Sequence, residues 1–191
     1  MTLPKTTALD LAPPDPLPNE VAELFAKCQD KLGLIPNVLV AYAHNPQKLR
    51  AFSQMYNTVM LAKSGITKLE REMIAVAVSS LNRCWYCLVA HGAAVRVMSQ
   101  NPELGEALVI NHHHAALSPR EQAIIGFARK LTTNSADIGE ADRAALRGHG
   151  FSDADIWDVA EVAAFFNMSN RMASAVGMLP NHEYHAMGRA G

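Results

Sequence analysis

Residues 67–91 read TKLEREMIAVAVSSLNRCWYCLVAH, and this stretch decides how the chain folds. Thr67 and Glu70 form the S/T-x-x-E pattern of a helix-starting capping box, in which each side chain bonds the other residue's backbone N–H. The run 73–78 alternates small and β-branched residues, which is also typical of a buried strand. Because the capping box stands directly before this run, the sequence predicts a helix here.

The rest of the chain also favours helices. Apolar residues recur at helical spacing over residues 21–28 and 49–60, and Ser118 and Glu121 repeat the capping box before another apolar run. Residues 156–166 are apolar on nearly every side, which predicts a central helix. A thioredoxin-like fold, with a strand leading into a CxxC helix, needs several more strands than the chain offers. The sequence therefore predicts an all-α fold.

The prolines suggest how the chain is divided. Five of them fall within residues 1–18, where the fixed φ and missing N–H groups predict an extended arm. This arm is either a frayed terminus or a segment that packs on a neighbouring subunit. We expect one helical domain over residues 19–180, followed by a short C-terminal tail over residues 181–191.

Composition excludes several classes of protein. The net charge is −1 over 191 residues, so the basic footprint of a nucleic-acid-binding protein is missing. The first residues do not form a signal peptide, and no apolar run reaches the ~20 residues that a membrane span needs. We expect a cytoplasmic protein without membrane contact. Only 18% of residues are charged, which suggests that some apolar surface is buried between copies in a homo-oligomer.

The chemistry of the chain is concentrated at a CxxC pair, Cys84 and Cys87, followed by His91. If residues 84–97 form a helix, these three side chains share one face at positions i, i+3 and i+7. Asn82 or Ser80 is expected to cap this helix. The sulfurs would then lie in the first turn, where the helix dipole favours an anion and lowers a thiol pKa.

Two residues could carry protons to and from these thiols. His91 lies one turn beyond Cys87, and Glu72, on the preceding helix, could orient the imidazole or accept the proton onward. A thiolate, a resolving thiol and a proton relay are the parts needed to reduce a peroxide through a sulfenic acid and a disulfide. The sequence therefore predicts a redox site made of Glu72, Cys84, Cys87 and His91.

Other interpretations of this motif stay open. The CxxC pair and His91 supply three zinc ligands, and one of His112, His113 and His114 could be the fourth, although three adjacent histidines more often form a polar loop. The cysteines could also be structural, or the chain could be a binding scaffold that does not use them. A further alternative is a redox-responsive assembly protein, in which the disulfide alters subunit contacts with little turnover.

Four other residues with polar or reactive side chains have a structural explanation, and three of them also have a functional one. Cys28 lies on an apolar helix face and is expected to be a buried small hydrophobe. Asn167, Asn170 and Arg171 fall within the predicted central helix and need partners if they are buried. They either hydrogen-bond between helices or line the redox pocket.

The spacing Glu72–x11–Cys84–x2–Cys87–x3–His91 resembles the E-x11-C-x-x-C-x3-H signature of AhpD-like alkylhydroperoxidases, in the carboxymuconolactone decarboxylase superfamily. The resemblance extends over roughly residues 20–180. Further stretches are similar to its peroxidase-related subgroup: Leu117–Glu121, Gly150–Asp153 and Phe165–Arg171.

This resemblance implies an all-helical AhpD-like fold, with the CxxC at the start of a central helix, assembled as trimers or hexamers. It implies peroxidase activity on hydrogen peroxide or organic hydroperoxides without haem, metal or another cofactor, with a thiol reductant that the sequence leaves unknown. Cys87 would attack the peroxide, Cys84 would be the resolving thiol and proton donor, and Glu72 and His91 would form the relay. Better-studied members carry a histidine where this chain has Tyr86, whose reference pKa near ~10 prevents a proton shuttle near neutrality.

Overall fold

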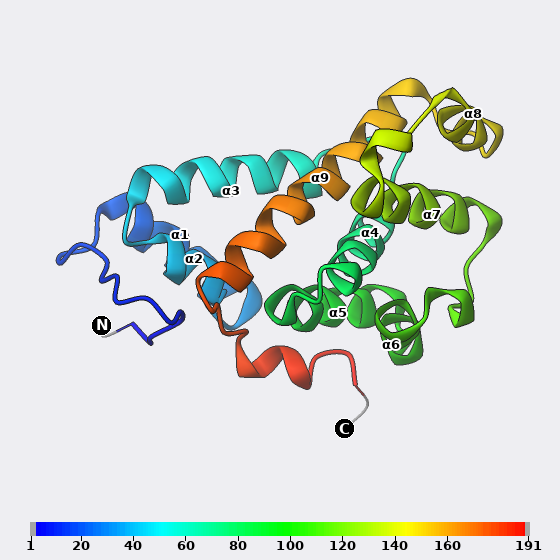
Figure 1. The fold of residues 1–191 in the computed structure, drawn as a ribbon. Coiled ribbons are helices and arrows are strands. Elements are labelled where there is room, and N and C mark those ends of the chain that lie inside the picture. The colour runs from blue at the N-terminus through cyan, green and yellow to red at the C-terminus, as the bar shows by residue number, and fades with distance from the viewer. Residues whose placement is uncertain (1–2, 190–191) are drawn as a thin grey trace.

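The computed structural model describes residues 3–189, and this part of the chain contains helices and turns but no strand (Figure 1). The all-α prediction is confirmed. Residues 1, 2, 190 and 191, which belong to the predicted arm and tail, lie outside the described residues. The α-helices are α1 (Asn19–Leu32), α2 (Asn37–Tyr42), α3 (Pro46–Leu61), α4 (Lys68–Leu81), α5 (Trp85–Ser99), α6 (Pro102–Ile110), α7 (Pro119–Thr133), α8 (Glu140–Gly148) and α9 (Asp153–Ala175). Short 3₁₀ segments are η1 (His112–His114), η2 (Ser135–Asp137) and η3 (His182–His185).

Helix α4 lies at the centre of the molecule and packs against α5, α6, α7 and α9. The capping box predicted at its start is present, because Thr67 N donates to Glu70 Oε2 at 2.7 Å and Glu70 N donates to Thr67 Oγ1 at 3.1 Å. Every residue from 70 to 79 is buried. The alternating run 73–78 therefore reflects a helix surrounded by protein on all sides, and not a strand.

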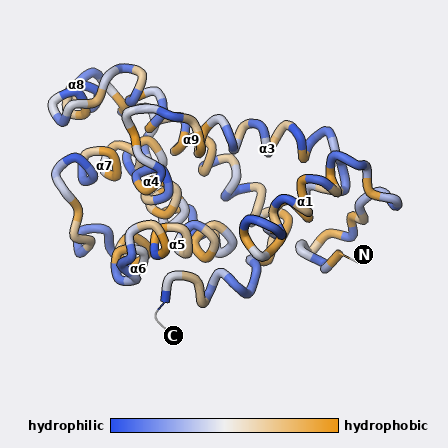
Figure 2. The backbone as a smooth tube through the Cα atoms, turned by 180° about the vertical axis from the view of Figure 1, so that it is seen from behind, coloured by the Kyte–Doolittle hydropathy of each residue, from blue (hydrophilic) through white to orange (hydrophobic). Residues whose placement is uncertain are grey.

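The outer helices are amphipathic. Figure 2 shows hydrophilic and hydrophobic residues alternating along α3, as expected for a helix with one face on the core. The long α9 crosses the molecule beside α3, α4, α5 and α7. Within residues 3–189, no helix combines the length and apolar character needed to cross a membrane.

The arm and the tail both pack on the chain's own helical domain. Ala8 N donates to Val176 O and Leu179 N donates to Thr6 O, each at 2.9 Å. The tail is held further by Asn181, whose Oδ1 accepts from Asn37 N at 2.7 Å. These contacts fasten the arm and the tail around the C-terminal end of α9.

A buried cation joins three of the helices. The guanidinium of Arg71, on α4, donates to Val59 O at the end of α3, to Ser64 Oγ at 2.7 Å and to Asp158 Oδ2 on α9 at 3.0 Å. The Arg71 side chain is only 2% exposed, so its charge depends on Asp158 for neutralisation.

The replacement Asp158→Asn should therefore leave a buried charge without a counterion. We expect the free energy of unfolding to fall by about 2 kcal/mol, measured by urea denaturation. Glu20→Gln removes the partner of Arg50 in an exposed ion pair and should change stability by less than about 0.5 kcal/mol. Equal effects of the two substitutions would contradict this account of Arg71.

Candidate functional site

The turn between α4 and α5 sets the position of the cysteines. Arg83 has a left-handed backbone with φ of 52°. Its N–H bonds Ser80 O at 3.2 Å, and the next N–H, of Cys84, bonds Ser79 O at 3.1 Å. This is the Schellman arrangement that ends a helix. Asn82 is therefore the C-cap of α4, and the expectation that Asn82 or Ser80 caps the following helix is wrong.

Cys84 itself occupies the N-cap position of α5, and Cys87 lies in the first turn. The unpaired N–H groups and the dipole of this turn favour negative charge on a nearby sulfur. Both cysteines are free thiols and each is only 1% exposed. The two sulfurs thus sit at a helix N-terminus, as predicted, but away from bulk solvent.

Glu72 and His91 meet across the α4–α5 interface. His91 Nδ1 lies 2.6 Å from Glu72 Oε2, and both side chains are almost fully buried. The edge of the His91 ring contacts Phe166, with ring centroids 4.6 Å apart. This packing fixes the imidazole with one nitrogen on the carboxylate, so the other nitrogen is left for exchange with a nearby group.

The environment makes Cys84 the more acidic of the two thiols. Its pKa is lowered to about 6, chiefly because the Cys87 S–H donates a hydrogen bond to the Cys84 sulfur. Burial opposes this effect, while the Ser174 hydroxyl and the charge of His91 support it. At neutral pH the negative charge of the reduced pair therefore resides on Cys84.

Cys87 has the opposite environment. Its hydrogen bond to Cys84 raises its pKa well above the usual value, and burial and the negative charge of Cys84 raise it further. Hydrogen bonds from Asn170 and Ser79 partly offset this effect. The two neighbouring sulfurs thus differ strongly in how readily they lose a proton.

Two of these neighbours extend the predicted site. Asn170 hydrogen-bonds from α9 to Asn82 and Ser79, and it also lowers the pKa of the Cys87 thiol. Asn167 bonds to Asn82 and Thr132, whereas Arg171 bonds within α9. Sequence reasoning missed Ser79, although it lies seven residues after Glu72 and thus on the same face of α4.

Apolar side chains cover the thiol pair. Around Cys84 and Cys87 pack Val38 and Ala41 of α2, Ala173 of α9, Val176 and Met178. A cavity of about 50 Å³ adjoins this cover and shares Ala41, Val176 and Met178 with it, the N-terminal arm forming another wall. A substrate would have to pass this cover to reach either sulfur.

Tyr86 belongs to the same cover. Tyr86 lies between the two cysteines in the sequence, and its side chain is buried. Its Oη accepts a hydrogen bond from Val38 N at 3.2 Å. Burial raises its pKa well above the usual value, so it stays protonated at neutral pH. The residue after Cys84, Trp85, is by contrast mostly exposed.

Metal binding finds no support in the arrangement of side chains. Within residues 3–189, no group of three His, Cys, Asp or Glu side chains is close enough together to hold an ion. The alternative zinc site, built from the CxxC pair, His91 and one of His112–His114, is therefore not formed. The three histidines form η1, which packs beside α6. Cys28 is half-buried on α1 and separate from the thiol pair.

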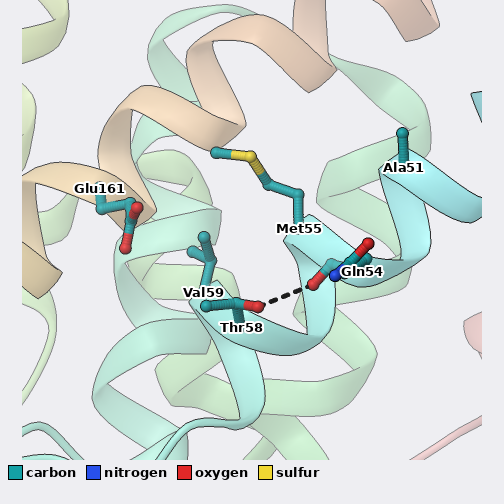
Figure 3. A pocket seen from close by; sticks show the side chains of 6 residues that line it. All are labelled: Ala51, Gln54, Met55, Thr58, Val59 and Glu161. Carbon is teal, nitrogen blue, oxygen red and sulfur yellow. Dashed lines mark hydrogen bonds between the residues drawn. The ribbon is translucent and has the colours of Figure 1, made fainter.

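A surface pocket larger than the cavity beside the thiol cover is separate from this chemistry. Figure 3 shows its lining by α3 side chains, including Met55 and Thr58, together with Glu161 from α9. Its volume is about 300 Å³, and none of Glu72, Cys84, Cys87 and His91 lines it. Size alone therefore does not identify the reactive centre of this protein.

Comparison with known proteins identifies the family of the chain. The model of the carboxymuconolactone decarboxylase family matches residues 46–110, which span α3 to α6. An uncharacterized peroxidase-related protein from Silicibacter sp. TM1040 is 58% identical, with a TM-score of 0.95 and 99% of each chain covered. The chain belongs to the AhpD-like, peroxidase-related proteins of the carboxymuconolactone decarboxylase family.

Other solved structures share the same fold. An uncharacterized peroxidase-related protein from Ralstonia eutropha JMP134, described as an alkylhydroperoxidase AhpD core, is 41% identical, with a TM-score of 0.94 over 98% of this chain and 99% of that one. The debrominase Bmp8, bound to 2,3,4-tribromopyrrole, has a TM-score of 0.77 at 20% identity, covering 95% of this chain and 97% of its own. No curated protein sequence matches the chain.

The acidity of Cys84 can be measured directly. In the reduced protein, alkylation of Cys84 should rise with pH around a midpoint near 6, since only the thiolate reacts. Cys87→Ala removes the S–H donor that chiefly lowers this pKa, so the midpoint should move up toward that of an ordinary thiol. Mass spectrometry of the alkylated peptides separates Cys84 from Cys28. An unchanged midpoint in Cys87→Ala would contradict the assigned cause.

Proposed function

We propose that this protein is a thiol peroxidase that reduces hydrogen peroxide or organic hydroperoxides through a Cys84–Cys87 disulfide cycle. The observation that carries the proposal is the buried thiol pair, with an acidic Cys84 bonded to Cys87 and the His91–Glu72 pair beside it. Membership of the AhpD-like, peroxidase-related proteins supports the same reaction class. The cycle uses protein sulfur and requires no cofactor.

The proposed cycle begins with a proton transfer between the sulfurs. The proton lost by Cys84 is held by the His91–Glu72 pair, and the Cys84 thiolate then takes the proton of Cys87. The resulting Cys87 thiolate attacks one peroxide oxygen, so that an S–O bond forms and the O–O bond breaks. Cys84 returns its proton to the departing alkoxide, which leaves as an alcohol, or as water when the substrate is hydrogen peroxide.

The second half of the cycle forms the disulfide. The Cys84 thiolate attacks the sulfenic sulfur of Cys87, and hydroxide leaves with the proton that His91 and Glu72 have held, giving water. In total, two thiols and one hydroperoxide give one disulfide, one alcohol and one water. An external thiol reductant must then supply the electrons that restore the pair.

Access and assembly form part of the proposal. The cavity beside the cover over the sulfurs measures only about 50 Å³, which favours compact peroxides. Large apolar side chains remain exposed on the single chain, among them Ile110 at 82% and Trp157 at 70%. Such exposure is consistent with a homo-oligomer, and the family resemblance suggests a trimer or a hexamer.

The role of Cys87 is tested by Cys87→Ser. This variant should lose all measurable peroxide consumption in a steady-state assay with a dithiol reductant, while its far-ultraviolet circular dichroism stays that of a helical protein. Cys28→Ser changes a cysteine outside the pair and should retain activity. Full activity of Cys87→Ser would falsify the proposal. Redox-dependent oligomer size without turnover in the unmodified protein would favour a redox-responsive assembly protein instead.

The relay is tested by Glu72→Gln. Glutamine keeps the size of the side chain but cannot stabilise a protonated His91, so the rate of peroxide consumption should fall about 10²-fold. The pH–rate profile should change as well, because the carboxylate that takes part in the proposed relay is gone. Glu161→Gln makes the same change at the separate pocket of Figure 3 and should have no such effect. Equal pH profiles for Glu72→Gln and the unmodified protein would remove Glu72 from the relay.

A further inference from the structure

A directed chain of hydrogen bonds ends beside Cys87. Asn170 is 1% exposed, and its Oδ1 accepts from Asn82 Nδ2 at 2.9 Å. Its own Nδ2 donates to Ser79 Oγ at 2.9 Å. Because the amide oxygen is occupied by Asn82, the NH₂ group of Asn170 must face Ser79 and the thiol.

The same logic gives the direction of the Ser79 hydroxyl. Its oxygen accepts from Asn170, which leaves the hydroxyl hydrogen available for another acceptor. Hydrogen bonds from Ser79 and Asn170 lower the pKa of the Cys87 thiol, so this sulfur is the acceptor at the end of the chain. A thiolate only accepts hydrogen bonds, so both neighbours are oriented toward the charged form of Cys87.

The origin of this orientation lies outside the thiol site. Asn82 Nδ2 also donates to Asn167 Oδ1 at 3.0 Å, and Asn167 Nδ2 donates to Thr132 Oγ1 on α7 at 2.9 Å. Asn82 itself is the C-cap of α4, at the turn that leads into Cys84. The donors at Cys87 are therefore fixed by side chains from α4, α7 and α9 before any substrate arrives.

We infer that Ser79 and Asn170 are catalytic hydrogen-bond donors to Cys87, which hold its negative charge as it attacks the peroxide, and that Asn82 is their positioning residue. The inference rests on the proposed function, because it concerns the nucleophile of that reaction. When Cys84 takes the proton of Cys87, the charge moves to a sulfur buried among apolar groups. Charge-assisted hydrogen bonds from neutral donors are strongest in such surroundings, and they need no rearrangement during the reaction.

The test isolates Cys87 from its coupled partner. In a Cys84→Ser background, the reactivity of Cys87 toward iodoacetamide is followed against pH, with the modified peptide identified by mass spectrometry. Adding Ser79→Ala or Asn170→Ala should raise the pH midpoint of Cys87 by about one unit each, since each removes a donor to the thiolate. The titratable groups around the sulfur, His91, Glu72 and Tyr86, are the same in every variant.

Ser80→Ala is the matched control. Ser80 is the next residue of α4, and its hydroxyl donates to Val109 O at 2.6 Å, outside the chain of donors at Cys87. This variant loses one serine hydrogen bond in the same helix and should leave the midpoint unchanged. A merely loosened structure would raise the alkylation rate at every pH without moving the midpoint.

The outcomes separate the inference from the proposed function. A midpoint that stays within about 0.3 units in both Ser79→Ala and Asn170→Ala, with a native helical spectrum, would overturn the donor role. The peroxidase assay is run in parallel on the unmodified Cys84–Cys87 pair. There, Ser79→Ala should slow peroxide consumption about tenfold, whereas Ser80→Ala should not. Shifted midpoints combined with no turnover in the unmodified protein would refute the peroxidase proposal and leave the donor assignment intact.

Discussion

The whole site depends on a turn made by Arg83, a residue other than glycine that adopts a left-handed backbone. A side chain in this conformation costs roughly 1–2 kcal/mol, which the surrounding contacts must offset. The turn stops α4 at Asn82 and restarts the chain at Cys84 as the N-cap of α5. A straight continuation of the helix would have placed Cys84 inside a hydrogen-bonded ladder, where the dipole and the free N–H groups have no effect on the sulfur.

Because of this turn, the two cysteine side chains differ in acidity although they are chemically identical. The S–H of Cys87 and the backbone N–H of Cys87 in the first turn of α5 lower the pKa of Cys84, whereas Cys87 is held protonated by the same S–H hydrogen bond. A pair in which one sulfur is a thiolate and the other a thiol is asymmetric before any reaction. Burial raises the pKa of both thiols, so the difference between them comes chiefly from the hydrogen bond that joins them.

The sequence predicts the helices and the reactive residues of this site better than the turn and the contacts that bring them together. The capping box at Thr67, the all-α fold and the pairing of CxxC with upstream and downstream relay residues all follow from local patterns, because caps and helical periodicity act over a few residues. The left-handed turn at Arg83 does not follow, since arginine carries no preference for it. Ser79 was also missed, because a serine in an apolar helix becomes a donor to the thiol only when α5 and α9 pack beside it.

Tyr86 stands where better-studied family members carry a histidine, and its packing against α2 gives it a structural role. A histidine at this place would add a second proton carrier. The tyrosine instead stays protonated, and its oxygen accepts a hydrogen bond from the backbone N–H of Val38. It therefore holds α2 over the sulfurs. With Tyr86 removed from proton transfer, the His91–Glu72 pair is the one carrier that the described site offers beside the thiols, and its single carboxylate contact fixes which nitrogen can exchange. The chain thus combines an apolar cover over the sulfurs with a single imidazole beside them. In the proposed mechanism, the neutral donors at Cys87 stabilise charge that no second imidazole can share.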